Sequence, residues 1–486
     1  MRAGKVLFKM AKYDTVIGLE THLQLSTETK IFCGCGNVFG DPPNSRVCPV
    51  CLGHPGSLPV LNRKAFEYAI KVALALGCGV QRTVKFDRKN YYYPDLPKNY
   101  QISQYDMPIA YDGKIKITLP GGVHKVIGIT RAHLEEDAGK LLHDIPGPSS
   151  YVDLNRTGTP LLEIVSEPDI SSPEEAYLYL VELKRLIRYL GVSDCNMEEG
   201  SLRCDANISL KPAGAAVLGS KVEIKNLNSF KAVREALNFE VARQTEALDE
   251  GEAIPQETRL WHEEQRVTIS MRTKEEAQDY RYFPDPDLVP FEVSSGVIES
   301  VRETLPELPA SKQERFLGQY GLGEKDIELL ISDIDLADFF EKTVKIFSDP
   351  QVVCNWVKGE VMMHLKEQGE SIESLGLSPQ TLAEIIQMAS SGRISGLSAK
   401  SVLKEVIGTG RSAEDIVRER SLEQVSDKGE LEGIVDSVIA DNQKSVNDFR
   451  SGKEAAIGFL VGQVMKKTSG KANPKVAGEM LRKRII

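Results

Sequence analysis

Polar side chains with ion-binding chemistry recur at every second position in the segment 201–210. Ser201, Arg203, Asp205 and Asn207 alternate there with apolar residues. Successive side chains of a β-strand point to opposite faces, so the alternation predicts a strand with one polar and one buried face. An arginine holds phosphate oxygens in a planar fork, and a carboxylate binds Mg²⁺. The polar face is therefore either a phosphate and metal site or the solvated face of an antiparallel sheet.

Two further segments repeat this design. In 15–25, Glu20 and His22 share the polar face of a predicted strand, and side chains two residues apart on a strand can reach one ion. A lone histidine on a sheet is more often structural, but the neighbouring carboxylate favours a metal site. In 221–225, the same alternation places Lys225 on a polar face. The three strands together favour a functional surface over a solvated one.

Consecutive acids end a fourth predicted strand, 126–138. Strict alternation places His133 and Glu135 on one face and Glu136 on the other. Acids in a row at the end of a strand are costly unless a cation or water meets them. The pattern alone does not decide which of the two glutamates faces the site.

Four cysteines form two close pairs on either side of a loop rich in Gly, Pro and Asn. They are Cys33, Cys35, Cys48 and Cys51. This spacing is typical of a structural zinc knuckle, in which four thiolates close a tetrahedral site and leave no open position for catalysis. The first pair is C-x-C rather than the commoner C-x-x-C, and the alternative is four unrelated free thiols. We expect a structural zinc site that stabilises a segment too polar to fold alone.

The segment 85–105 is rich in Tyr, Asn, Lys and Arg and is interrupted by prolines. Basic residues mixed with aromatic ones suit a nucleotide or a tRNA end, through charge and base stacking. A tyrosine-rich loop that packs on its own domain would have the same composition. The sequence leaves these two alternatives equal.

Overall composition indicates a globular protein of several domains. The chain has 486 residues, 41% of them hydrophobic, and a net charge of −10. An acidic chain argues against general nucleic-acid coating, so any such contact needs a local basic patch. No apolar run approaches the length of a membrane span, and the apolar part of the basic N-terminus is too short for a signal peptide. We expect a cytosolic protein, in which cysteines are thiols or metal ligands.

The pattern changes along the chain. Strand signals dominate the first part, and helical periodicity takes over after Pro290. We predict domains at 1–292, 293–410 and 411–486. The last of these ends in a basic patch fit for phosphates, although a solvated terminus is the alternative. Its basic residues are Lys466, Lys467, Lys471, Lys475, Arg482, Lys483 and Arg484.

Six motifs in this order resemble those of GatB, a subunit of the tRNA-dependent amidotransferases, in the GatB/GatE family. They lie at 16–22, 87–95, 133–140, 154–168, 197–207 and 279–284. Motifs of this length are highly specific, and together they span nearly the whole chain. The archaeal GatE branch carries an extra inserted domain for which this chain has no space, so the resemblance is to GatB. The four cysteines occur in only some members, so the zinc prediction concerns this sequence rather than the family.

The resemblance implies an α+β fold. Its N-terminal cradle domain would be built on an antiparallel sheet with a glutamine synthetase-like layout, followed by all-α helical and YqeY-like tail domains. It also implies a function: with ATP, misacylated Glu-tRNA(Gln) or Asp-tRNA(Asn) is activated to an acyl phosphate, which ammonia converts to Gln-tRNA or Asn-tRNA. The ammonia would come from a separate amidase subunit, GatA, joined through a small subunit, GatC. The sequence does not decide between the two tRNAs.

The implied chemistry assigns roles to the polar strands. Acyl phosphate formation is in-line transfer between anions, so it depends on positioning and charge neutralisation. Mg²⁺ would be held by Glu20, His22 and one of Glu135 and Glu136, and Asp205 could hold a second ion. Arg203 and Lys225 would bind phosphate oxygens, and the nucleotide would also contact Glu199, Ser201 and Asn207. The rival hypothesis is a non-catalytic, zinc-containing tRNA adaptor that presents tRNA to an enzyme elsewhere.

Overall fold

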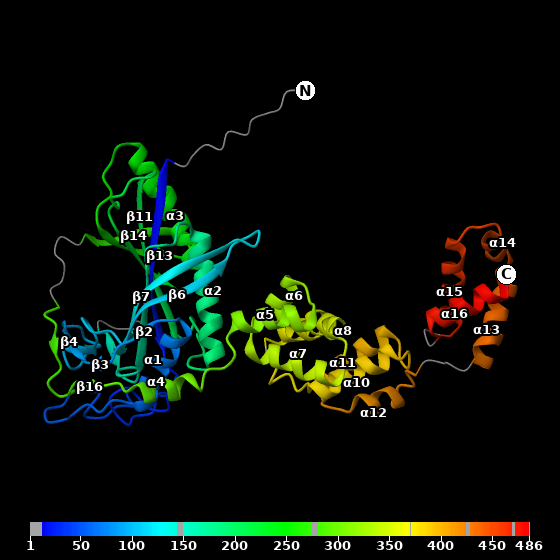
Figure 1. The fold of residues 1–486 in the computed structure, drawn as a ribbon, viewed down its shortest axis with the longest axis horizontal. Helices are drawn as coiled ribbons and strands as arrows, with labels where there is room; N and C mark the ends of the chain where they lie inside the picture. The colour runs from blue at the N-terminus through cyan, green and yellow to red at the C-terminus, as the bar shows by residue number, and fades with distance from the viewer. Residues whose placement is uncertain are drawn as a thin grey trace. The chain divides into compact units, whose positions relative to one another are not determined.

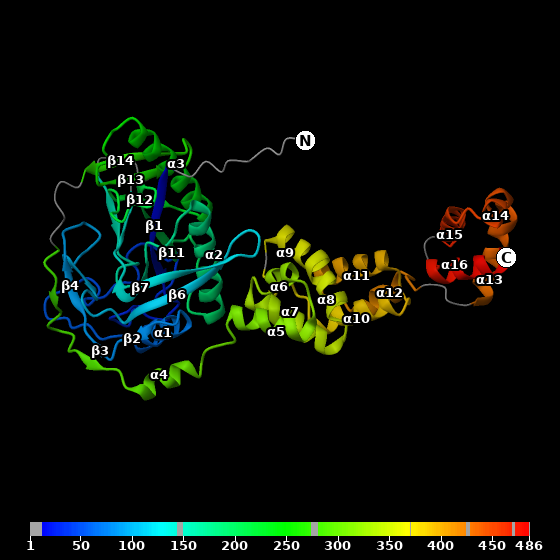
Figure 2. The same cartoon turned by 45° about the horizontal axis from the view of Figure 1, so that its top comes forward.

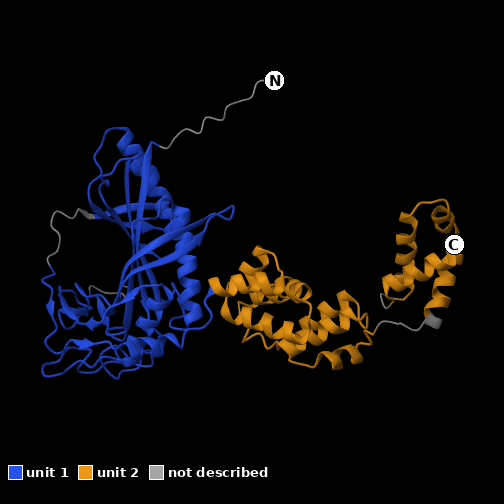
Figure 3. Cartoon of the chain, viewed as in Figure 1, with its two compact units in different colours: residues 1–309 blue, residues 310–486 orange. Residues whose placement is uncertain are grey.

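The computed structural model divides into two compact units, Met1–Pro309 and Ala310–Ile486, which are shown separately in Figure 3. Each unit is described by itself. The structure describes residues 12–142, 149–273, 280–369, 371–423, 428–468 and 472–485.

Unit 1 is built on a large, mainly antiparallel sheet. Among the described residues this sheet has nine strands in the order β14-β13-β12-β11-β1-β10-β7-β6-β2, and only β12 and β13 pair in parallel. The long strand β1 lies at its centre (Figure 1). The strands are β1 Tyr13–Gln24, β2 Gly79–Val80, β6 Ala110–Thr118, β7 His124–Glu136, β10 Pro160–Ser166, β11 Leu202–Pro212, β12 Val222–Leu227, β13 Glu257–His262 and β14 Val267–Thr273.

The sheet has one apolar face, which packs against helices. Ile17, Leu134, Ile164 and Ala206 lie on this face and are almost fully buried, each at a position that alternates with a polar one. The helices that complete this core are α1 Arg63–Ala75, α2 Pro173–Leu190 and α3 Phe230–Asp249. Helices α2 and α3 run along the same side of the sheet (Figure 2). Burial of this face leaves the opposite face of the central strands to carry polar side chains.

Local signals explain where these helices begin. Ser172 accepts a hydrogen bond from the backbone N–H of Glu175 and is followed by Pro173, a residue favoured in a first helical turn, so α2 starts at this point. Helix α3 is capped by Ser229 and buries Glu240 completely. A buried carboxylate needs partners, and Glu240 has them in two guanidinium groups, at 2.8 Å from Arg243 and 3.1 Å from Arg259.

Smaller sheets flank the main one. Their strand orders are β15-β4-β5, β16-β3 and β8-β9. Strand β5 packs against β7 of the main sheet. Helix α4, Ser295–Arg302, packs against α1 and the first core. The strands are β3 Thr83–Val84, β4 Asp87–Asn90, β5 Tyr100–Ser103, β8 Lys140–Leu142, β9 Tyr151–Asp153, β15 Phe283–Pro284 and β16 Phe291–Glu292.

Unit 2 is helical throughout its described elements and contains two hydrophobic clusters. The first joins α5 to α12, and the second joins α13 to α16. Its elements are α5 Pro309–Tyr320, α6 Glu324–Leu330, α7 Ile334–Ile346, α8 Pro350–Trp356, a π-helical turn η1 Val357–Val361, α9 Met362–Gln368, α10 Pro379–Ser390, α11 Gly396–Thr409, α12 Ala413–Glu419, α13 Lys428–Asp441, α14 Gln443–Arg450, α15 Ala455–Lys467 and α16 Pro474–Ile485.

The architecture confirms the predicted α+β class, with a mainly antiparallel sheet followed by helices. The residues at which the hydrophobic clusters end differ from the predicted domain boundaries at 292 and 410. Helix α4 follows the first boundary but packs on the core of unit 1, and α12 follows the second but packs with α10 and α11. Among the described residues, no helix combines the length and apolar character that a bilayer span requires.

Candidate active site and metal centres

The polar face of the main sheet brings the predicted site strands together at its centre. Antiparallel pairing places His22 of β1 directly opposite Glu163 of β10 on one side and Arg203 of β11 on the other. Glu163 lies in turn opposite His133 of β7. Residues opposite one another on the same face have Cβ atoms about 5 Å apart, so four strands contribute to one row of ionisable groups.

Two side chains of this row, His22 and Glu163, converge with Glu135, which lies two residues beyond His133 on β7. The imidazole Nε2 of His22 lies 3.3 Å from a carboxylate oxygen of Glu163 and 3.8 Å from one of Glu135. Ligand atoms of all three residues lie within 4.8 Å of one another. An imidazole nitrogen and two carboxylates are a donor set that a divalent cation accepts, the carboxylates matching Mg²⁺. The group therefore fits a metal centre.

The electrostatics of these groups favour a cation between them. Burial alone would lower the pKa of His22, but the hydrogen bond to Glu163 and the charges of Glu163 and Glu135 raise it above its ordinary value. Burial alone would raise the pKa of Glu135, but the neighbouring His133 and His22 hold it below its ordinary range. Both carboxylates are thus kept ionised in a buried place, where a positive charge is stabilised.

A second imidazole borders the same carboxylates. The Nε2 of His133 lies 3.4 Å from Glu163 and 3.6 Å from Glu135. Ser103 of β5 donates a hydrogen bond of 3.2 Å to Glu135. The buried Nδ1 of His133 has no hydrogen-bond partner among the described residues, so the network has capacity for a further donor or acceptor such as water.

Cationic groups stand beside this cluster on β11 and β12. Arg203 donates to the buried Asp137 at 2.8 Å, and its buried Nε has no hydrogen-bond partner among the described residues. Lys225 contacts Asp205 at 2.6 Å and Glu223 at 2.8 Å, and these acids raise its pKa above the ordinary value despite burial. The ammonium of Lys225 and the guanidinium of Arg203 are both groups that can bind anionic oxygens.

The remaining predicted residues of the face occupy different surroundings. Glu20 accepts a hydrogen bond of 2.8 Å from Asn207, and it is not part of the three-residue metal cluster in the described residues. Asp205 lies opposite Glu20 in the register. Glu199 is exposed in the turn before β11, whereas Ser201 is buried and its carbonyl accepts from the backbone of β1.

Glu136 is the one predicted ligand that the fold turns away from the site. It follows the alternation of β7 onto the other face, where it forms an ion pair with the nearly buried Lys98 and accepts 2.8 Å from the backbone N–H of Ile102. Its charge is already balanced there. The alternative left open by the sequence is thus resolved by geometry, because Glu135 rather than Glu136 adjoins His22.

The four predicted zinc ligands come together in the loop that follows β1. Sulfur atoms of Cys33, Cys35, Cys48 and Cys51 all lie within 4.8 Å of one another. Burial raises the pKa of Cys35 to about 11, while hydrogen bonding by Cys33 and Cys48, together with the charge of Lys30, lowers the pKa of Cys51 to about 5. Four sulfurs this close cannot all ionise without a shared cation. The cluster could hold a metal ion, and its all-thiolate donor set fits Zn²⁺.

The cysteine loop is fastened to the turn that leads into β10. Asn44 accepts 2.8 Å from the backbone N–H of Leu154, and Asn155 accepts 2.8 Å from that of Arg46. The fully buried Lys30 donates 2.7 Å to the carbonyl of Arg46 and lies 3.8 Å from the sulfur of Cys51. The cysteine loop thereby contacts the turn that precedes β10, the strand that carries Glu163.

Comparison with known sequences decides the family. Residues 15–299 match the GatB/GatE catalytic domain, and residues 338–485 match the GatB domain. The chain belongs to the GatB/GatE family. It is 55% identical to a protein of Carboxydothermus hydrogenoformans over 479 residues, which cover 98% of this chain and 99% of the relative. That protein is named as a subunit of aspartyl/glutamyl-tRNA(Asn/Gln) amidotransferase, as are relatives in Caldanaerobacter subterraneus, at 54%, and Brevibacillus brevis, at 52% identity.

The C-terminal basic residues of this chain are only partly available. Lys467 pairs with Asp441, Arg482 with Glu454, and Arg484 with Glu432 and Asp436. Three further predicted residues, Lys466, Lys475 and Lys483, are exposed, and Lys471 lies outside the described residues. The surface ion pairs are weak and can exchange an acid for a phosphate, so the tail remains a predicted tRNA contact.

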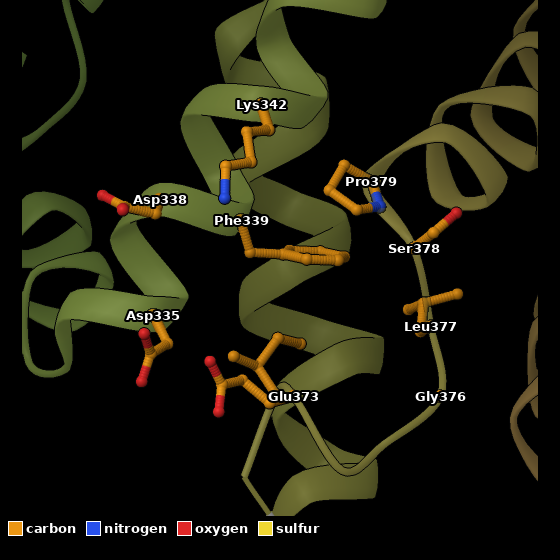
Figure 4. Close-up of a pocket in the computed structure, with 10 residues that line it drawn as sticks. Asp335, Asp338, Phe339, Lys342, Glu373, Gly376, Leu377, Ser378 and Pro379 are labelled. Carbon is orange, nitrogen blue, oxygen red and sulfur yellow. The ribbon is translucent and has the colours of Figure 1, made fainter.

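A cavity of about 370 Å³ in the helical unit lies apart from these predicted residues. Phe339 of α7 and Leu377 of the loop before α10 line it together with Lys342 and three acids, so its lining is mainly acidic (Figure 4). The acids are Asp335, Asp338 and Glu373. An acidic lining does not suit phosphate. The cavity therefore adds nothing to the candidate site of the sheet.

Two functional candidates escaped the sequence analysis. Glu163 lies in an otherwise apolar segment, 161–165, and a glutamate amid Leu, Ile and Val is itself a signal because an unpaired buried charge is costly. Asp137, 3% exposed, accepts from Arg203 and from Gln24 at 3.0 Å. Its partner lies 66 residues along the chain, so no local pattern could identify the pair.

Proposed function

We propose that the polar face of the sheet activates the side-chain carboxylate of a misacylated tRNA with ATP. The observation that supports this most strongly is the single row across β7, β10, β1 and β11, which joins a cation-attracting cluster to a guanidinium. Phosphoryl transfer between two anions requires neutralisation of the charge on the phosphates and fixed positions for the reacting oxygens. The cluster and the guanidinium together could supply these two requirements.

The proposed reaction has two steps. A carboxylate oxygen of the glutamyl or aspartyl group attacks the γ-phosphorus of ATP, the bond from this phosphorus to the β–γ bridging oxygen breaks, and ADP leaves. Ammonia then attacks the carbonyl carbon of the acyl phosphate, inorganic phosphate leaves, and loss of a proton gives the amide. The product is Gln-tRNA or Asn-tRNA.

Named residues divide this work. Arg203 and Lys225 bind phosphate oxygens, and Asp137 orients Arg203 through its hydrogen bond of 2.8 Å. His22, Glu135 and Glu163 would hold Mg²⁺. When bound, the ion would neutralise negative charge on the phosphates. The carboxylates lie in a buried part of the face, which limits the water that would hydrolyse an acyl phosphate.

The zinc ion and the partners are part of the same proposal. The cysteine cluster would hold structural Zn²⁺ and thereby fix the turn before β10. The relatives' names describe one subunit of a larger amidotransferase, so we propose an amidase subunit of the GatA type as the ammonia source, a GatC-type subunit that joins the two, and misacylated tRNA as substrate. We propose a cytosolic location for the protein, because this function requires access to aminoacyl-tRNAs.

An ammonium-driven assay tests the function. The isolated chain is given ATP, Mg²⁺, ammonium and either Glu-tRNA(Gln) or Asp-tRNA(Asn), and amidated product is measured after deacylation. We expect amidation with ammonium and none with glutamine, since ammonia needs no partner once the acyl phosphate exists. Absence of both product and tRNA-dependent ADP, even after the amidase subunit is supplied, would favour the tRNA adaptor.

A further inference from the structure

An aromatic stack stands at the edge of the candidate site. The rings of Tyr105 and Tyr282 lie face to face, with centroids 4.1 Å apart and planes 11° from parallel. Tyr282 is half-buried, whereas Tyr105 remains 60% exposed although one of its faces is covered. The stack therefore presents a flat, accessible aromatic face.

The stack is joined directly to the metal-binding candidates. Ser103, two residues before Tyr105, donates its hydroxyl to Glu135 at 3.2 Å. One short segment therefore carries both a hydroxyl that contacts Glu135 and the exposed ring of Tyr105.

The fold holds this stack in place. The backbone N–H of Tyr105 donates 3.1 Å to Asp87 of β4, and Phe283, next to Tyr282, pairs with Arg88 of the same strand. Arg281 has a φ of 44°, a left-handed conformation that costs a non-glycine residue energy and brings the flanking tyrosines together. Two distant segments of chain are therefore fixed against one strand to form the surface.

We propose that the exposed face of Tyr105 binds an adenine base by stacking. The inference rests on the proposed function, because the phosphates of ATP would then extend toward Glu135, His22 and Arg203. Base stacking on an aromatic side chain tolerates any purine and needs only a flat face beside a charged channel. The same adenine chemistry has a second source in the 3′-terminal adenosine of tRNA, which must also reach this site.

Competition binding with two probes tests the adenine site. Mg²⁺-ATP and Mg²⁺-tripolyphosphate share the triphosphate, but only ATP carries a base. For the full chain, Tyr105→Ala should weaken ATP binding by about 5-fold to 150-fold, the range for one lost base stack, and should leave tripolyphosphate binding unchanged. Tyr105→Phe keeps the ring and should bind ATP like the wild type. Tyr151→Ala removes an exposed tyrosine from the separate β8–β9 sheet and serves as the matched control.

A tRNA arm distinguishes the two sources of adenine. If the stack binds the tRNA end, Tyr105→Ala weakens binding of intact tRNA, leaves ATP binding unchanged, and has no effect on tRNA that lacks its terminal adenosine. Unchanged binding of both ATP and intact tRNA would overturn the inference, as would an equal loss of tripolyphosphate binding. A wild-type chain without tRNA-dependent ADP formation would instead overturn the proposed function, so the two failures are separable.

Discussion

Replacing Asp137 by Asn tests whether Arg203 works from a fixed position. Asp137 is buried, and one of its oxygens accepts from Arg203 at 2.8 Å and from Gln24 at 3.0 Å. An amide of the same shape removes the negative charge and one acceptor, so the guanidinium loses its anchor. Packing is preserved, which separates the positioning role from core stability.

The expected loss follows from the geometry. Hydrogen bonds to charged groups contribute about 1.5–3 kcal/mol, and the Arg203 side chain is 37% exposed, so solvent screening places the value near the lower end. About 1.5 kcal/mol corresponds to roughly a tenfold decrease in kcat/KM for ATP. We expect this decrease in tRNA-dependent ADP formation, with a thermal unfolding curve close to that of the wild type.

Asp153→Asn is the matched control. Asp153 also accepts two backbone hydrogen bonds of 3.0 Å, from Asn44 and Asn155, but belongs to the cysteine-loop contact rather than to Arg203. An unchanged kcat/KM in Asp137→Asn, or an equal decrease in Asp153→Asn, would refute the positioning argument.

The other predictions concern metal, zinc, stability and tRNA. Glu163→Gln should raise the Mg²⁺ concentration needed for half-maximal ADP formation at least about tenfold, and an unchanged Mg²⁺ titration would contradict the ligand set. We expect elemental analysis to find about one zinc ion per wild-type chain, and Cys51→Ser should lose this ion and lower the Tm; a zinc-free wild type would remove this site. Glu240→Gln should cost about 1.5–3 kcal/mol in denaturant unfolding, because it removes the charge-assisted hydrogen bonds of a fully buried carboxylate and leaves Glu257 as the remaining counter-charge of Arg259. Burial would raise the pKa of Glu240, but hydrogen bonds from Arg243, Thr268 and Gln244 lower it in the folded protein. The stabilisation by the ionised Glu240 is therefore present above the unfolded pKa of about 4.3 and is lost as pH falls through the lower folded pKa. Equal stability of the variant and the wild type at neutral pH would argue against this contribution. Deleting 428–486, which removes the basic tail but keeps α12 in its own cluster, should raise the KM for tRNA and flatten its dependence on salt, whereas an unchanged salt slope would indicate a solvated end.

Alternation in the sequence was sufficient to predict the central strands and their polar faces. Glu20, His22, Arg203 and Lys225 all occupy the face that the pattern assigns to them. This succeeds because the period of a strand is fixed by its backbone, so burying the apolar positions settles the direction of the others. The cysteine pairs were predictable for a similar reason, since their spacing is set by one short loop.

Long-range register determined what the pattern could not. Glu136 is balanced by Lys98, which lies 38 residues earlier in the chain, and the row from His133 to Arg203 exists only because β10 and β11 pair on either side of β1. The apolar surroundings of Glu163 concealed it, because a period-two pattern does not reveal a charge that neighbouring strands neutralise. Similarly, the stack of Tyr105 on Tyr282 joins segments that no sequence window contains together.

Transfer of a labelled oxygen tests the central claim most directly. Glu-tRNA(Gln) or Asp-tRNA(Asn) is prepared with ¹⁸O in the side-chain carboxylate and incubated with the chain, ATP, Mg²⁺ and ammonium, and the inorganic phosphate is analysed by mass spectrometry. If the carboxylate attacks the γ-phosphorus, its oxygen leaves with phosphate when ammonia displaces it, so the phosphate should carry ¹⁸O in proportion to the amide formed. Amidated product accompanied by unlabelled phosphate would contradict activation through an acyl phosphate.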